Sequence, residues 1–114
     1  MDSPAESRGE IQGPSPMELV TLALGGCTGM DVVDILLKRR VSLKNLEVTI
    51  NYQRQQEHPR IFSEIEIEYT VKGNGIKEED VALAVNLSKD KYCSVSKMLE
   101  KTARITHKWK IVNQ

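Results

Sequence analysis

The sequence has little of what many functional classes require. Its formal net charge is zero, because 16 Lys and Arg offset 16 Asp and Glu, so it lacks the field that collects nucleic acids or acidic membranes. One Trp, one Phe and three Tyr are too few for a base-stacking platform. No apolar run reaches the roughly 20 residues of a membrane-spanning helix, and the polar start lacks the apolar region of a signal peptide. We therefore expect a cytoplasmic protein that binds neither nucleic acid nor a membrane.

Sequence motifs for metals and cofactors are also missing. The two Cys do not form a CxxC pair, and with only two His they argue against a zinc cluster. The sequence contains no phosphate-binding Gly-rich loop, no Ser–His–Asp arrangement and no HExxH motif. It thus predicts no metal site and no bound cofactor.

The length of 114 residues fits one domain. Residues 1–15 contain Pro, Ser and Gly without apolar periodicity, which is typical of an extended arm. We therefore place the folded domain at residues 16–114.

A long helix is predicted from the start of this domain to Arg40. Ser15 can cap it, and Glu18 stands three residues later, the spacing of a capping box. Three glycines surround Cys27, and each costs about 1 kcal/mol relative to Ala in a helix. They indicate either close packing against a neighbouring element or a local bend that exposes the backbone near Cys27.

Three later segments alternate apolar and polar residues with the period of a strand that has one buried face. They cover residues 45–52, 64–71 and 105–111, and the polar loop 55–59 predicts an antiparallel hairpin between the first two. The Gly-containing run 72–75 is expected to end the second strand.

Helical spacing returns between residues 81 and 99. The polar run 88–91 divides this segment and leaves Cys93 at the start of its second half. The predicted order is helix, strand, strand, helix, helix, strand, which is an α+β fold with an antiparallel sheet. The first helix carries apolar side chains on more than one face, and one sheet layer cannot cover them all, so we expect a partner chain.

Cysteine is the strongly nucleophilic side chain with the most suggestive placement. Cys27 lies among small residues that let a reagent approach its sulfur, and Cys93 lies near a helix start, where a thiol pKa is lowered. If the two are close in space, they can cycle between dithiol and disulfide. The alternative is that both are ordinary buried cysteines. His107, on the apolar face of the last strand, is expected to be a packed core residue rather than a ligand or base.

Three segments together resemble a known family. They are residues 14–20 (PSPMELV), 23–33 (ALGGCTGMDVV) and 91–95 (KYCSV). With them the chain is similar, over residues 13–112, to members of the OsmC/Ohr superfamily of osmotically inducible and organic hydroperoxide resistance proteins, in particular its small YhfA-like branch.

The resemblance implies an OsmC-like fold, with an antiparallel sheet packed on a long central helix in an intertwined homodimer. It also implies a thiol peroxidase that reduces organic hydroperoxides. Cys27 would be the peroxidatic cysteine, and Cys93 the resolving cysteine that condenses with its sulfenic acid. An external dithiol would restore both thiols, and no metal or bound cofactor is needed.

The sequence departs from the family pattern at two places. Active members carry a Glu ten residues before the first Cys, where this chain has Met17, and Glu18 follows about 100° further around the helix. Glu18 therefore either serves the catalytic site or caps the helix. The family's catalytic Arg lies on an early strand that this chain is expected to lack, with Arg8 as a weak substitute.

Two other functions remain open from the sequence. One is a non-catalytic dimer that binds a small apolar or thiol-reactive molecule near Cys27. The other is a scaffold in which both cysteines are merely packed.

Overall fold

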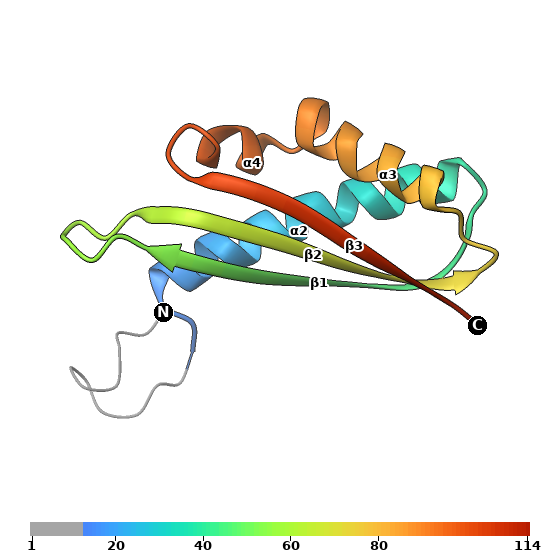
Figure 1. The fold of residues 1–114 in the computed structure, drawn as a ribbon, viewed down its shortest axis with the longest axis horizontal. Helices are drawn as coiled ribbons and strands as arrows, with labels where there is room; N and C mark the ends of the chain where they lie inside the picture. The colour runs from blue at the N-terminus through green and yellow to red at the C-terminus, as the bar shows by residue number, and fades with distance from the viewer. Residues whose placement is uncertain (1–12) are drawn as a thin grey trace.

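One long helix and one three-stranded sheet, laid face to face, make up most of the structure, a computed structural model that describes residues 13–114. Residues 1–12, most of the expected arm, lie outside the described residues. The elements, in chain order, are α2 (Pro16–Lys38), β1 (Ser42–Arg54), β2 (Phe62–Asn74), α3 (Glu78–Leu87), the π-helical turn η1 (Ser88–Tyr92), α4 (Ser94–Leu99) and β3 (Arg104–Asn113). Figure 1 shows α2 behind the strands, with α3 and α4 above them. The α+β class is confirmed.

The helix α2 begins with the capping box that the sequence predicts. The Glu18 backbone N–H donates to Ser15 Oγ at 3.3 Å, and the Ser15 N–H donates to Glu18 Oε1 at 3.4 Å. The helix is continuous through its glycines. A Cβ on Gly25 would meet Ile50 at 3.5 Å, and one on Gly29 would meet Val48 at 3.4 Å. Gly25 and Gly29 therefore lie where α2 packs closely on β1, as one of the two alternatives expected, whereas a Cβ on Gly26 would meet nothing within 4 Å.

The sheet has the order β1-β2-β3 and is mixed. The β1–β2 hairpin is antiparallel, as predicted, but β3 pairs parallel to β2. The expectation of a wholly antiparallel sheet is therefore wrong. The reason is the connection through α3, η1 and α4, which returns the chain to the end of the sheet where β2 begins.

The apolar residues of the three strands share one face of the sheet. In β2, the side chains of Ile65, Ile67, Tyr69 and Val71 are at most 1% exposed. Paired rows continue this face, so that Ile67 stands between Ile50 and His107. The opposite face carries the acidic residues of β2, where Lys108 Nζ lies 3.3 Å from Glu66 and 3.6 Å from Glu68.

The second strand continues three residues beyond the expected end of its pattern, to Asn74. Gly73 is buried and paired with Leu43 within the sheet. A Cβ at this position would collide with the Ser42 carbonyl oxygen and crowd Ile76. Glycine here is thus a requirement of close approach inside the strand rather than a strand breaker, which corrects the expectation for residues 72–75.

The outward side of α2 remains largely apolar and exposed. Leu22, Met30 and Leu37 are 62%, 75% and 55% exposed. By length and composition α2 could cross a membrane, which corrects the expectation that no segment could. The core helix of a soluble protein passes the same test, and α2 buries Leu24, Val32 and other side chains in the core.

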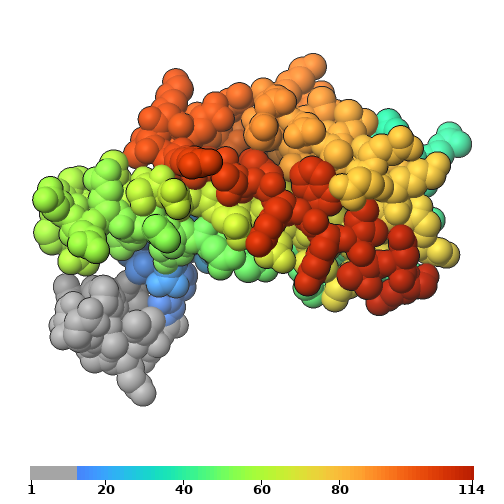
Figure 2. All heavy atoms as spheres, in the orientation of Figure 1, coloured from blue at the N-terminus to red at the C-terminus, as the bar shows by residue number. Residues whose placement is uncertain are grey.

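The molecule has extents of 48 × 30 × 18 Å. It is thin because a single helix layer packs on a single sheet. In the space-filling view, the β1–β2 hairpin projects at one end and β3 crosses the visible face (Figure 2).

Candidate functional site

The fold brings the two cysteines together from distant parts of the chain. Cys27 lies in the middle of α2, and Cys93 lies between η1 and α4. Their sulfurs and a carboxylate oxygen of Asp31 all lie within 4.8 Å of one another. Both cysteines are free thiols.

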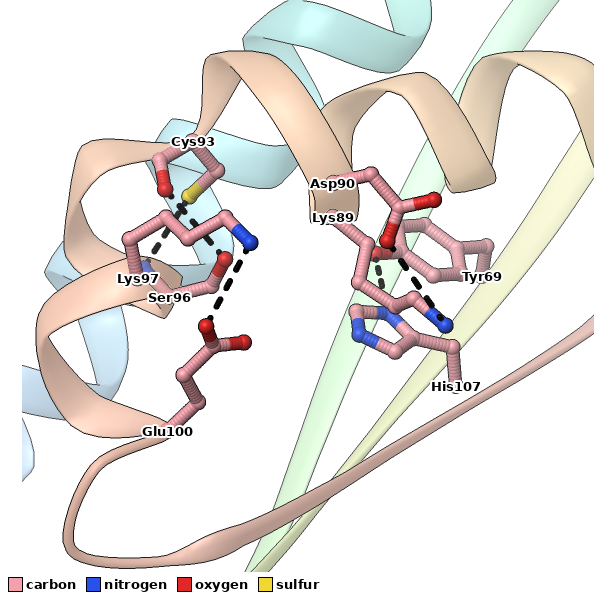
Figure 3. A network of polar contacts seen from close by, with 8 residues as sticks. All are labelled: Tyr69, Lys89, Asp90, Cys93, Ser96, Lys97, Glu100 and His107. Atoms are coloured by element: carbon pink, nitrogen blue, oxygen red, sulfur yellow. Dashed lines mark hydrogen bonds and ion pairs between the residues drawn. The ribbon is translucent and has the colours of Figure 1, made fainter.

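Cys93 is held at the start of α4. Its Sγ accepts a hydrogen bond from the Ser96 backbone N–H at 3.4 Å, and its carbonyl oxygen accepts one from Ser96 Oγ at 3.3 Å (Figure 3). The side chain is fully buried. The polar run 88–91 divides the segment as predicted, because the chain there forms the π-helical turn η1 that ends at Tyr92.

The pKa of the Cys93 thiol is raised, chiefly because burial disfavours the thiolate and further because of the neighbouring Cys27 thiol. The hydrogen bonds from Ser96 act in the opposite direction. The expectation that a helix start lowers this pKa is therefore wrong. Helix α4 has only six residues, and its N-terminal field does not outweigh the loss of solvent.

Cys27 is more accessible than Cys93. It is half-buried, and a Cβ on the neighbouring Gly26 would meet nothing within 4 Å, so open space adjoins this part of α2. Asp31 lies one helical turn after Cys27 on the same face. Its Oδ2 accepts a hydrogen bond from Ser88 Oγ at 2.9 Å, and Ser88 is fully buried. Asp31 is thereby held toward the cysteine pair from the side of η1.

A polar pair joins β2 to β3 on the helix side of the sheet. The Tyr69 hydroxyl and His107 Nδ1 lie 3.0 Å apart, and their rings are nearly parallel (Figure 3). Burial raises the pKa of Tyr69 to about 12, while Thr28 acts in the opposite direction. Burial also lowers the pKa of His107, and Lys89 adds to this. His107 is thus a half-buried, packed residue on the inner face of the sheet, and its Nε2 is buried without a hydrogen-bond partner in the described part of the chain.

Two hollows meet at Asp31. A groove of about 880 Å³ lies between α2 and β1, and its apolar lining includes Gly26, Gly29, Met30, Val33, Leu46 and Val48. A cavity of about 410 Å³ lies on the other side, among α2, α3 and η1. Asp31 lines both hollows, so small molecules and ions can approach the cluster along it.

The residues predicted for the site are thus only partly brought together. Cys27 and Cys93 meet, whereas Glu18 lies nine residues before Cys27, about 13 Å along the helix, with its carboxylate in the capping box. Arg8 lies outside the described residues. Sequence reasoning missed Asp31 and Ser88. The spacing of four between Cys27 and Asp31 was a visible signal, but nothing in the sequence pointed to Ser88.

Comparison with known proteins decides the family. A family profile described as "OsmC-like protein" matches residues 8–108. This chain belongs to the OsmC-like family. The resemblance drawn from its sequence motifs is confirmed.

Two proteins are similar to this OsmC-like protein over most of its length. Protein YhfA of Escherichia coli K12 is 46% identical over 101 residues, which cover 89% of this chain and 75% of that protein. The crystal structure of a hypothetical protein from Aquifex aeolicus VF5 has a TM-score of 0.87 at 35% identity, covering 91% of this chain and 78% of that one.

A more distant structure shares the fold alone. The organic hydroperoxide resistance protein OhrB of Bacillus subtilis has a TM-score of 0.63 at 17% identity, covering 93% of this chain and 76% of that one. The OsmC-like fold of the chain therefore extends to proteins of the hydroperoxide resistance group.

Proposed function

We propose that this protein is a cysteine-based peroxidase that reduces organic hydroperoxides, with Cys27 as the peroxidatic and Cys93 as the resolving cysteine. The observation that carries the proposal is the meeting of two free thiols of unequal exposure. Cys27 is half-buried beside open space, and Cys93 is fully buried. A peroxide therefore meets Cys27 first, and Cys93 is kept for the second step.

The reaction needs only these two sulfurs and an external reductant. The Cys27 thiolate attacks the terminal oxygen of the hydroperoxide, the O–O bond breaks, and the alkoxide takes up a proton to leave as the alcohol. Cys27 becomes a sulfenic acid. The Cys93 thiol then attacks this sulfur, a disulfide forms and water leaves. An external dithiol reduces the disulfide by exchange and is itself oxidised.

Membership of the family supports this proposal, since OhrB of Bacillus subtilis carries organic hydroperoxide resistance in its name. The apolar groove that Gly26 and Asp31 line supports an organic rather than an inorganic peroxide. Glu18 contributes to the proposed site only as the cap of α2, because its carboxylate is bound to the Ser15 backbone.

The active form is proposed to be a homodimer in the cytoplasm. The exposed apolar side of α2, with Leu22, Met30 and Leu37, is a surface that a second copy would cover. The reducing cytoplasm would keep both cysteines as free thiols between turnovers. Light scattering of the purified protein would give the mass of a single chain if the dimer proposal is wrong.

The experiment that tests the peroxidase follows the consumption of cumene hydroperoxide and of H₂O₂ with dithiothreitol as the dithiol. We expect turnover of the organic peroxide in the wild type and none in Cys27→Ser. Without reductant, the reaction of Cys93→Ser should stop at the sulfenic acid of Cys27, which dimedone traps. The wild type should instead form the Cys27–Cys93 disulfide. Ser94→Ala, at an exposed neighbour of Cys93, is the matched control and should keep full turnover.

Turnover that survives in Cys27→Ser, or its absence in the folded wild type, would overturn the proposal. A second candidate, a non-catalytic protein that binds an apolar molecule, is favoured by the groove of about 880 Å³. It predicts saturable binding of an apolar fluorescent probe by both cysteine variants, with no consumption of peroxide.

A further inference from the structure

Cys27, Asp31 and Cys93 form a set of metal donors as well as a thiol pair. Two sulfurs and one carboxylate suit Zn²⁺, and the thiolates disfavour the hard ions Mg²⁺ and Ca²⁺. Two of these donors stand one helical turn apart on α2, and the third comes from the start of α4. A site that joins two elements in this way has its donors placed by the core of the fold rather than by a mobile loop.

The distances fit a tetrahedral ion after a small adjustment. Zn–S bonds of about 2.3 Å and a Zn–O bond of about 2.0–2.2 Å separate neighbouring donors by roughly 3.5–3.8 Å. The donor atoms here lie within 4.8 Å of one another, so no pair of donors has to close by more than about 1.3 Å. Cys93 is fixed by Ser96, whereas the half-buried Cys27 side chain has room to turn toward the ion.

The surroundings also resemble those of a metal site. Ser88 Oγ donates to Asp31 Oδ2 at 2.9 Å, an outer hydrogen bond of the kind that orients a carboxylate ligand. Neither Cys93 nor Ser88 is exposed to solvent, so the side of the site that these two residues form is shielded from water. Asp31 lines a hollow on each side, so an ion can reach this donor from solvent.

We propose that the reduced protein binds one Zn²⁺ ion through Cys27, Asp31 and Cys93, and that bound metal and the Cys27–Cys93 disulfide exclude each other. Binding releases the two thiol protons and moves no electrons, so it is reversed by a chelator. The ion acts as an inhibitory ligand and not as a cofactor. The sequence argued against a zinc site because it has no CxxC pair and only two His, and folding supplies the missing proximity of the donors.

The consequence for activity rests on the peroxidase proposal, whereas the binding itself does not. When Cys27 is bonded to Zn²⁺, the lone pair that would attack the peroxide is engaged in the Zn–S bond. The Cys93 sulfur is held by the same ion and cannot attack Cys27. Peroxide should therefore oxidise the zinc-loaded protein more slowly, and removal of the metal should restore the rate.

The first test measures binding without any activity. The reduced full-length protein is titrated with Co²⁺, which should give thiolate-to-cobalt charge-transfer absorption, and with Zn²⁺ against a chromophoric chelator. We expect one ion per chain. Cys93→Ser and Asp31→Asn should weaken Zn²⁺ binding by about 100-fold or more, and Ser88→Ala by about 10-fold. Mg²⁺ should not compete.

The matched control is Asp34→Asn. Asp34 is a carboxylate on the same helix, but it is exposed and paired with Lys38 at 2.9 Å. This variant should bind Zn²⁺ as tightly as the wild type. Circular dichroism on every variant separates loss of binding from loss of folding, and Ser88→Ala, which retains all three donors, keeps the test informative if Cys93→Ser fails to fold.

Three results would overturn the metal site: no cobalt charge-transfer band in the reduced wild type, equal affinity in wild type and folded Asp31→Asn, or undiminished Zn²⁺ binding by the disulfide form. The two proposals fail separately. Metal binding in a protein without peroxide turnover would refute the peroxidase alone, and turnover without metal binding would refute the metal site alone.

Discussion

Ionisation of Tyr69 is expected to be delayed to strongly alkaline pH. Its side chain is fully buried, and burial raises its pKa from 10.0 to about 12. Between these two values the unfolded chain releases the phenolic proton, while the folded chain retains it. The unfolded state then binds fewer protons, so stability must fall as the pH rises. Two pKa units at roughly 1.4 kcal/mol each make this loss about 3 kcal/mol.

Two measurements check the value. The ultraviolet absorbance of tyrosinate in the folded protein should show a step near pH 12 that Tyr69→Phe removes, whereas Tyr52→Phe, at an exposed residue, should leave it in place. Urea unfolding should give a stability that falls more steeply above pH 10 in the wild type than in Tyr69→Phe. Other groups titrate in this range, but their contributions cancel in the difference between the two proteins.

The variant also loses the hydrogen bond with His107, which costs about 1 kcal/mol at all pH values below the step. Its curve should therefore start lower and run flatter. If the two stability curves run parallel from pH 10 to pH 12, Tyr69 ionises as readily in the folded as in the unfolded state. The reasoning from burial would then be refuted.

Three further predictions concern stability. Gly73→Ala places a Cβ against the Ser42 carbonyl oxygen and should cost about 1–3 kcal/mol in urea unfolding; an unchanged midpoint would mean that the strand edges are looser than described. Ser15→Ala removes the capping box and should cost about 1 kcal/mol, which thermal unfolding would reveal as a lower Tm. Burial lowers the pKa of His107 from 6.5, so below pH 6.5 the unfolded chain binds a proton that the folded chain refuses, and stability should fall with decreasing pH. His107→Gln should flatten this fall, and an NMR titration that places the imidazole pKa at or above 6.5 would contradict the prediction.

Most of the fold could be predicted from the sequence because its local patterns are strong. The alternation in residues 45–52, 64–71 and 105–111 identified the buried face of each strand, and paired rows such as Ile50, Ile67 and His107 confirm it. The direction of β3 could not be predicted in this way. Alternation is the same for a strand that runs either way, and the direction depends on how far α3, η1 and α4 carry the chain before it returns.

The candidate site was only partly predictable, for a related reason. The family motifs singled out Cys27 and Cys93, and the fold brings both to one place. Asp31 lies within the motif of residues 23–33 but was given no role there, and Ser88 belongs to no motif that sequence reasoning used. Their hydrogen bond joins α2 to η1, a contact that depends on the packing of two helices and leaves no periodic signal in either segment.

The glycines around Cys27 connect the sequence with the site most directly. Gly25 and Gly29 reduce the helix propensity of α2 by about 2 kcal/mol together. In return they let α2 lie so close to β1 that a Cβ at either glycine would already be in van der Waals contact with Ile50 or Val48. Larger side chains would move the helix away from the sheet and take Cys27 with it, while Cys93 stays anchored to α4 through Ser96. The spacing of the two sulfurs is therefore set by residues that never touch them, and Gly25→Leu should separate the thiols without altering either one.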